Sequence, residues 1–360
     1  MNGPFDVSRG VTASRLSRRH LLKATALTTA ALACPAIRPV RAETEKPSLD
    51  AARKEGSLVL WHADQEGQTL DFLKVFTEKT GLQVKQQHIL PGVAFPKLIA
   101  EIRAGMSDVD VFCGSDAILE EARKRGFLLE YRSPELDAYG PAFRSNPPGF
   151  WTAYYSIANI IMYNPKIIAP SEAPKTWVDL LDPKFKNSVG VQTAAAGTQY
   201  LWWYLLRPIV PADYWTRLQG QKVRAYESST QMVKAIVSGE LKVGGKVSDF
   251  QYVQGARRGE PLEGIYPAEG VPTGSQVGGI VKSTKRPNAA KIFWDFLLSK
   301  EGQAAWNTSF GSHSPRADVK IPGVRSLTDY KLLTVTDLAD YSSPQRLAEF
   351  TELWNKVTGF

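Results

Sequence analysis

The stretch FWTAYYSIANIIMYNPK (150–166) decides the fold, because it is apolar and extended for longer than one compact lobe needs. A second extended stretch, LEGIYPAEGVPTGSQVGGIVKST (262–284), is rich in glycine and returns the chain. Extended runs between regular α/β segments indicate strands that pass from one part of a protein to another. We therefore expect two lobes joined by two hinge crossings, near 155–165 and 265–280.

The residues before the first crossing alternate between strand and helix patterns. Ser48 is expected to cap a short helix that ends near Gly56, and Leu70, Leu73 and Phe76 are expected on the buried face of the next helix. The expected strands are 57–63, 82–89 and 109–114, and the expected helices are 69–81, 95–105 and 117–126. Such alternation favours an α/β fold in which each lobe is a mainly parallel sheet flanked by helices.

The part after the first crossing repeats this alternation. Helices are expected at 199–209 and 228–240, with a strand at 242–250 between the second helix and the return crossing. These patterns predict lobe 1 from 43–153 plus 275–325 and lobe 2 from 154–274 plus 326–360.

The first 42 residues are predicted to be an export signal. They hold seven basic side chains and one acidic one, followed by a short apolar run and a small-residue end at Ala42. SRRHLLK (17–23), with Arg18 and Arg19, resembles a twin-arginine signal, which implies the twin-arginine export machinery and the periplasm. ALAC (31–34) loosely matches a lipid-attachment motif, so a lipid anchor on Cys34 is the alternative.

The charge of the remaining chain argues against nucleic acid as a partner. Removing the signal leaves 37 basic and 35 acidic residues, so most of the net charge of +8 belongs to the signal. Cys113 is then the only cysteine left unless Cys34 is retained, and without Cys34 no intramolecular disulfide forms.

Six stretches carry a family resemblance: FTEKTGLQV (76–84), VDVFCGSDA (109–117), the run 151–165 ending in MYNP, TWVDLLDPKFK (176–186), IVSGE (236–240) and RPNAAKIFWDFLLSKEGQ (286–303). Together they resemble the family 1 extracellular solute-binding proteins of ABC importers, in the branch of ferric-ion, phosphonate and polyamine binders. The resemblance implies a type II two-lobed periplasmic-binding-protein fold, a small-molecule ligand in the cleft, lobe closure, and an ABC permease in the inner membrane as partner. It implies a monomer with no cofactor.

Ligands in open α/β sheets bind beyond the carboxyl ends of strands, where helix N-termini begin. Loops that follow expected strands or precede expected helices, together with nearby side chains, predict a set of ligand-binding residues. It comprises Trp61, His62, Asp64, Gln65, Ser115, Asp116, Tyr154, Tyr155, Thr198, Tyr226, Ser228, Asp249, Tyr252 and Glu269. Helix capping is the alternative role of the serines, Thr198 and Asp116, and core packing is that of Trp61 and the tyrosines.

The class of solute stays open between three alternatives. Hydroxyl groups and backbone N–H groups suit a small organic solute with a phosphonate or carboxylate, which is the expectation. Ferric iron would use Tyr154, Tyr155 and Tyr252, although adjacent residues of a strand point to opposite sides and only one of the first two should face a ligand. The resemblance also implies two adjacent tyrosines after a lobe 2 strand, where this chain has Phe250 and Gln251.

A cationic polyamine is the third alternative, because Asp64, Asp116, Asp249 and Glu269 could line the same cleft. An enzyme is not expected. His62, His88 and His313 are the histidines left after signal removal, and the chain has no G-x-S-x-G, H-E-x-x-H or paired-cysteine motif.

Overall fold

The computed structural model describes residues 46–89, 91–194 and 197–359. They belong to one unit, Thr44–Phe360, while the predicted signal with Arg18, Arg19 and Cys34 lies outside the described residues. Within the described ranges, no helix is both long and apolar enough to cross a membrane.

Lobe 1 begins with the predicted alternation of strands and helices. Its first elements are α1 (Leu49–Glu55), β1 (Leu58–His62), α2 (Glu66–Thr80), β2 (Val84–His88), α3 (Pro91–Arg103), β3 (Val111–Ser115) and α4 (Asp116–Lys124). The strand β1 pairs in parallel with both β2 and β3, so the predicted parallel arrangement is confirmed here. Two 3₁₀ turns, η1 (Leu136–Ala138) and η2 (Pro141–Phe143), lead to the first crossing.

Local sequence explains where the first helices start and stop. Ser48 Oγ accepts the backbone N–H of Ala51 and caps α1, as predicted. Gly81 ends α2 in the left-handed conformation at φ 75°, which favours glycine. The buried face of α2 differs from the prediction, because Leu70 is 51 % exposed while Phe72 is buried beside the predicted Leu73 and Phe76.

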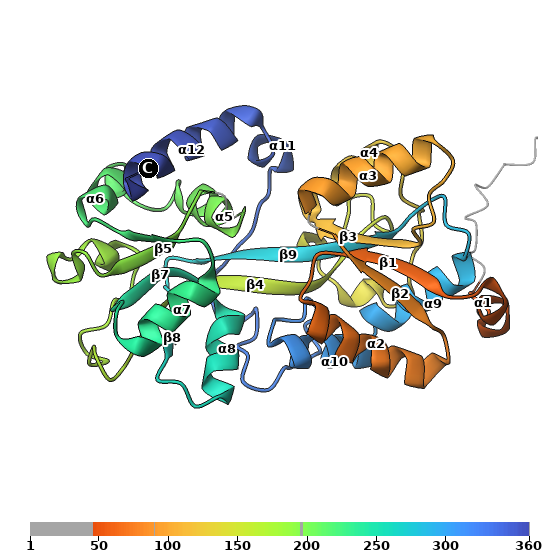
Figure 1. Cartoon of the computed structure of the whole chain (residues 1–360), viewed down its shortest axis with the longest axis horizontal. Coiled ribbons are helices and arrows are strands. Elements are labelled where there is room, and N and C mark those ends of the chain that lie inside the picture. The colour runs from red at the N-terminus through yellow and green to blue at the C-terminus, as the bar shows by residue number, and fades with distance from the viewer. Residues whose placement is uncertain (1–45, 90, 195–196, 360) are drawn as a thin grey trace, which may run out of the picture. The chain divides into compact units, whose positions relative to one another are not determined.

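The two predicted crossings are the strands β4 (Thr152–Tyr163) and β9 (Val271–Ile280). They run side by side and antiparallel, from Thr152 opposite Gly278 to Ala158 opposite Thr273 (Figure 1). The strand β9 also pairs with β3, and β4 also pairs with β7 (Val243–Ser248), each antiparallel. The lobes therefore share one sheet, in the order β2-β1-β3-β9-β4-β7, continued by β5 (Val189–Gln192) and β6 (Arg224–Tyr226).

Lobe 2 contributes the parallel part of this shared sheet that lies on the other side of the crossings. Its elements include η3 (Val178–Leu181), η4 (Pro183–Phe185), β5 (Val189–Gln192), α5 (Gly197–Leu206), α6 (Tyr214–Gly220), β6 (Arg224–Tyr226), α7 (Ser229–Ser238), β7, α8 (Asp249–Arg257) and β8 (Glu263–Ile265). The strand β5 pairs in parallel with β6 and β7. The predicted strand at 242–250 ends at Ser248, because Asp249 already begins α8.

A third passage follows the two predicted crossings. Helices α9 (Pro287–Leu298) and α10 (Lys300–Phe310) pack on α1 and α2 of lobe 1. The chain then runs through 311–331 to β10 (Leu332–Leu333), which pairs with β9. Helices α11 (Leu338–Tyr341) and α12 (Pro344–Thr358) follow, and α12 packs on α5 and α6 of lobe 2.

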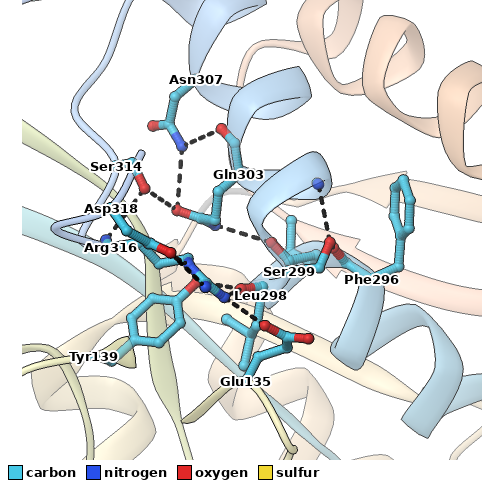
Figure 2. Close-up of polar contacts among 12 residues, drawn as sticks. Glu135, Tyr139, Phe296, Leu298, Ser299, Gln303, Asn307, Ser314, Arg316 and Asp318 are labelled. Atoms are coloured by element: carbon cyan, nitrogen blue, oxygen red, sulfur yellow. Dashed lines mark hydrogen bonds and ion pairs between the residues drawn. The ribbon is translucent and has the colours of Figure 1, made fainter. Parts of the chain in front are cut away.

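A buried polar cluster fixes the start of this third passage on lobe 1. Arg316 lies between the carboxylates of Glu135 and Asp318, at 2.5 and 2.9 Å, and also donates to the Leu298 carbonyl (Figure 2). Ser314 Oγ donates to Gln303 Oε1 at 2.7 Å. Because Arg316 is only 7 % exposed, both its charge and its hydrogen bonds are satisfied inside the protein.

Candidate functional site

A cavity of about 490 Å³ lies against the crossing strands and takes its lining from both lobes. Its lining residues are Ser115, Asp116, Ala142, Trp151, Ile157, Asn159, Thr198, Leu201, Thr273, Gly274, Ser275, Gln276, Val277, Thr334, Val335 and Tyr341. The volume is in the range of small-molecule sites, which are mostly apolar with a few polar groups. Here the walls combine aromatic and aliphatic side chains with hydroxyl and amide groups.

The lobe 1 wall contains Ser115 and Asp116, which the strand-end rule predicted. Ser115 ends β3 and accepts the Ile118 N–H at 3.4 Å, so it also caps α4. Asp116 Oδ1 accepts the Ala117 N–H at 2.8 Å. Burial raises the pKa of Asp116, because a carboxylate loses hydration there. Asp116 is the only aspartate or glutamate among the described lining residues.

The lobe 2 wall contains Thr198, near the start of α5. Its hydroxyl lies 3.1 Å from Gln192 Oε1 and accepts a hydrogen bond from Lys246 Nζ at 2.5 Å. Lys246 Nζ also donates to Gln192 Oε1. Thr198 is therefore more than a helix cap, because it belongs to a polar network with Gln192 of β5 and Lys246 of β7 that extends to the cavity.

Two lining residues each have a side-chain amide oxygen with no hydrogen-bond donor among the described residues. Asn159 on β4 donates its Nδ2 to the Pro272 carbonyl at 3.0 Å, while its Oδ1 is buried without a partner. Gln276 Oε1 on β9 is in the same state. Buried acceptors without donors are costly, so a donor that reaches either oxygen, from water or from a solute, would be stabilising.

None of the predicted residues at the end of β1 belongs to the described cavity lining; Trp61 and His62 are buried in lobe 1, and Gln65 is exposed. Trp61 is buried in the core, with Lys97 Nζ 4.7 Å from its ring centre. His62 bonds Gln86 and accepts the Asp64 N–H, and burial lowers its pKa. Gln65 is exposed and lines a second hollow, of about 510 Å³, with residues of α7 and α8.

Tyr154 and Tyr155 both donate to the same carboxylate. Their hydroxyl groups lie 2.6 and 2.7 Å from Asp64, which is 3 % exposed. The expectation that adjacent strand residues point to opposite sides is wrong here, because the register of β4 shifts between Ala153 and Tyr155. Burial raises the pKa of Asp64, and the two phenol hydrogen bonds oppose that shift.

Asp249 is fully buried under the first crossing. It accepts the Ala158 N–H at 3.1 Å and the Tyr266 hydroxyl at 2.9 Å, and it pairs with His313. Burial opposes the charged form of His313, but the charge and hydrogen bond of Asp249 outweigh it and raise the pKa of His313. This carboxylate is thus already paired inside the protein.

The other predicted lobe 2 residues also lie away from the cavity lining. Glu269 Oε1 accepts the Trp177 N–H at 3.1 Å, and Ser228 caps α7 by accepting the Gln231 N–H at 3.2 Å. Tyr226 and Tyr252 pack against the core beneath β4, α7 and β7. Of the four acids that could serve a polyamine, Asp116 alone reaches the described cavity lining.

Within the described ranges, no three His, Cys, Asp or Glu side chains lie close enough together to hold a metal ion. The three tyrosines of the iron alternative do not share one cluster either. Tyr154 and Tyr155 lie in one core cluster, and Tyr252 packs against another.

Sequence reasoning missed the lining residues of the crossings and of the C-terminal segment. Ile157 and Asn159 are two positions apart on β4, whereas all five residues from Thr273 to Val277 on β9 line the cavity. The alternation on β4 was a usable signal, because it places side chains on one face of a strand, but β9 offers no such pattern. Thr334, Val335 and Tyr341 follow no regular pattern.

The fold and cavity define a class: a two-lobed α/β protein with a solute-sized cavity against its crossing strands. The model of the family described as "Bacterial extracellular solute-binding protein" matches residues 107–330, and the chain belongs to that family. The prediction of an extracellular solute-binding protein of an ABC importer is thereby confirmed.

Named relatives differ in what they bind. The chain is 23% identical to an Fe(3+)-binding periplasmic protein of Serratia marcescens, over 80% of this chain and 85% of the relative. It is 25% identical to a putative 2-aminoethylphosphonate-binding periplasmic protein of Salmonella typhimurium, over 79% and 85%. Among solved structures it resembles the periplasmic binding protein AfuA of Actinobacillus pleuropneumoniae with fructose-6-phosphate bound, at a TM-score of 0.68 and 25% identity, over 85% and 99%.

Proposed function

We propose that this protein captures a small organic solute carrying an oxyanion, such as a phosphonate or carboxylate, and delivers it to an ABC permease. The observation that carries the proposal is the cavity itself, whose lining joins Ser115 and Asp116 of lobe 1 to Thr198 of lobe 2 across the crossing strands. A solute that touches both walls favours the closed arrangement, which a permease can recognise. We further propose the periplasm as location, twin-arginine export, and a monomer.

The hinge is proposed to lie within β4 and β9. The predicted lobe boundaries, between residues 153 and 154 and between residues 274 and 275, fall inside these two strands and agree with a hinge there. The segment 311–331 is a third connection between the lobes, and it would also have to bend when they close.

The lining supports an organic solute more directly than it supports a bare ion. Trp151, Leu201 and Val277 can contact a carbon skeleton, while Asn159 and Gln276 each lack a donor that a hydroxyl or amine would supply. Of the relatives, the aminoethylphosphonate-binding and fructose-6-phosphate-bound proteins carry names that fit this class.

Ferric iron is the second candidate, favoured by the name of the Serratia relative. The donor set weighs against it, since the hydroxyl groups of Tyr154 and Tyr155 already bond Asp64 and all three side chains are buried. An iron site built on them would have to break both hydrogen bonds. Catalysis is not proposed: burial raises the pKa of the Cys113 thiol, so its reactive thiolate is disfavoured.

The test is a thermal-shift screen of the mature protein with phosphonates, carboxylates, sugar phosphates, diamines and ferric citrate, followed by calorimetry on each solute that binds. We expect an organic oxyanion to bind at a 1:1 ratio and Thr198→Val to weaken it at least tenfold. Ser228→Ala, which removes a comparable helix-start hydroxyl outside the cavity, is the matched control. Binding of ferric ion alone would replace the proposal with the iron alternative.

A further inference from the structure

Lys246 is a buried lysine without a counterion. It lies on β7, its exposed fraction is 0 %, and no carboxylate of the described chain lies within salt-bridge distance of it. Buried ammonium groups are expensive unless a negative charge accompanies them. The structure therefore holds a buried amine that has no carboxylate partner among the described residues.

The neighbours of Lys246 are neutral. Its Nζ donates to Gln192 Oε1 and to Thr198 Oγ1, the second at 2.5 Å. An ammonium has three N–H donors, so these two contacts leave one donor without an acceptor among the residues that the structure describes. Burial is what lowers the pKa of Lys246, to about 7, with no neighbouring charge to restore it. A structural lysine would be expected to have a carboxylate here.

Lys246 is not among the described lining residues of the cavity, but it contacts one of them. Thr198, which accepts from Lys246, is itself a lining residue and lies in the first turn of the ten-residue helix α5. The N-terminal end of a helix carries a partial positive charge and favours anions. The helix and the ammonium thus act on the same wall with the same sign, while the acid at the cavity, Asp116, belongs to the opposite lobe.

We infer that Lys246 and Thr198 form the anion subsite of the cavity, with Lys246 supplying the charge that compensates a phosphonate, phosphate or carboxylate group of the solute. The inference rests on the proposed function and deepens it, because it assigns the end of the solute that faces lobe 2. On binding, the Thr198 hydroxyl exchanges its hydrogen bond to Gln192 Oε1 for one to the anion, and Lys246 Nζ, which donates to both Gln192 Oε1 and Thr198 Oγ1, keeps both oxygens satisfied. A solute without an anionic group leaves the charge of Lys246 uncompensated and is rejected.

A solely structural role makes an opposite prediction. If Lys246 only holds Gln192 and Thr198 in place, removing its ammonium should destabilise the protein and leave charge selectivity intact. If it is an anion subsite, Lys246→Met should raise the ligand-free melting temperature, because the cost of burying a charge disappears. Thr198 and Gln192 lie 3.1 Å apart and can still bond each other in that variant.

The experiment compares wild type, Lys246→Met and Lys242→Met, the last an exposed lysine immediately before the same strand. Probes are inorganic phosphate, 2-aminoethylphosphonate, 4-aminobutanoate, 1,4-diaminobutane and ferric citrate, measured by calorimetry and thermal shift. We expect at least one oxyanion and not the diamine to bind wild type, a more than tenfold loss in Lys246→Met, and no loss in Lys242→Met.

The outcomes separate this inference from the proposed function. Equal oxyanion affinity in wild type and Lys246→Met overturns the subsite and leaves solute capture standing. Binding of the diamine with no oxyanion also overturns the subsite while keeping an organic solute. Binding of ferric ion alone, or of none of the probes at 10 mM, overturns the proposed organic oxyanion and the subsite with it.

Discussion

Replacing Asp249 by alanine should lower stability and leave solute binding in place. Asp249 is fully buried at the start of α8 and holds three groups together: the Ala158 N–H of the first crossing, the Tyr266 hydroxyl and the His313 ring. The variant leaves all three buried without their acceptor. It therefore tests whether a predicted ligand-binding carboxylate is instead a support of the hinge strand.

The magnitude follows from the groups left behind. Removing one partner of a buried ion pair costs about 3–5 kcal/mol, and an orphaned buried N–H costs about 1–3 kcal/mol, with the two not fully additive. Because His313 can become neutral once Asp249 is gone, we take about 4 kcal/mol for the free energy of unfolding. For a chain of this size each kcal/mol lowers the melting temperature by roughly 2 °C, which gives roughly 8 °C.

The pH dependence has a definite sign. Asp249 raises the pKa of His313 above 6.5, so the pair stabilises the folded protein fully below that value and loses its contribution as pH rises through the folded pKa. The difference between wild type and Asp249→Ala should therefore be larger at pH 6 than at pH 9. Urea unfolding followed by tryptophan fluorescence measures it at both values.

Asp116→Ala is the matched control, since it removes the carboxylate at the cavity. It should cost less than about 1 kcal/mol, the usual value for an acid in the first turn of a helix, and change solute affinity instead. The reasoning is refuted if Asp249→Ala keeps wild-type stability and abolishes binding. Asp249 would then be a ligand-binding carboxylate, as its sequence position suggested.

Three further predictions concern single side chains. Lys246→Met should raise the free energy of unfolding by about 2 kcal/mol at pH 7 and by less at pH 9. The pKa of Lys246 is about 7 in the folded protein and 10.5 in the unfolded chain, so between these values the unfolded chain binds a proton that the folded protein lacks, and the resulting penalty on stability shrinks as pH rises. Urea titrations at both pH values check this. Arg316→Met should cost about 1–2 kcal/mol by removing the buried donor to the Leu298 carbonyl, and Arg316→Lys should restore only part of it, as measured by calorimetric melting. Tyr155→Phe should cost about 1–2 kcal/mol of unfolding free energy through the lost donor to Asp64, measured by urea unfolding, and leave solute affinity unchanged; loss of binding at wild-type stability would contradict it.

Local sequence signals predicted much of the fold. Ser48 and Gly81 mark helix ends because capping depends on one residue and its immediate neighbours. Leu70 misled the helix-face prediction, since helical spacing alone does not say which of two adjacent apolar stripes faces the core. The register shift after Ala153 was equally invisible, because it depends on pairing with β9, far along the chain.

The site was predictable only where strand ends supply it. Ser115, Asp116 and Thr198 follow or approach strand ends, so the general rule for α/β sheets pointed to residues that line the cavity, and their role in binding stays a prediction. Asn159 and Gln276 lie within the crossings, where the sequence patterns predicted only Tyr154, Tyr155 and Glu269 as ligand-binding residues. Lys246 was missed because a lysine in a strand suggests an exposed face, whereas here β7 pairs with β4 and β5 and is buried along its whole length.

Native mass spectrometry beside elemental analysis tests the central claim most directly. The mature protein would be purified from the periplasm without added solute, and Thr198→Val would be prepared in parallel. We predict one organic anionic adduct on the wild type, absent from Thr198→Val, and no stoichiometric metal. One iron per chain, retained in Thr198→Val and with no organic adduct, would contradict the account.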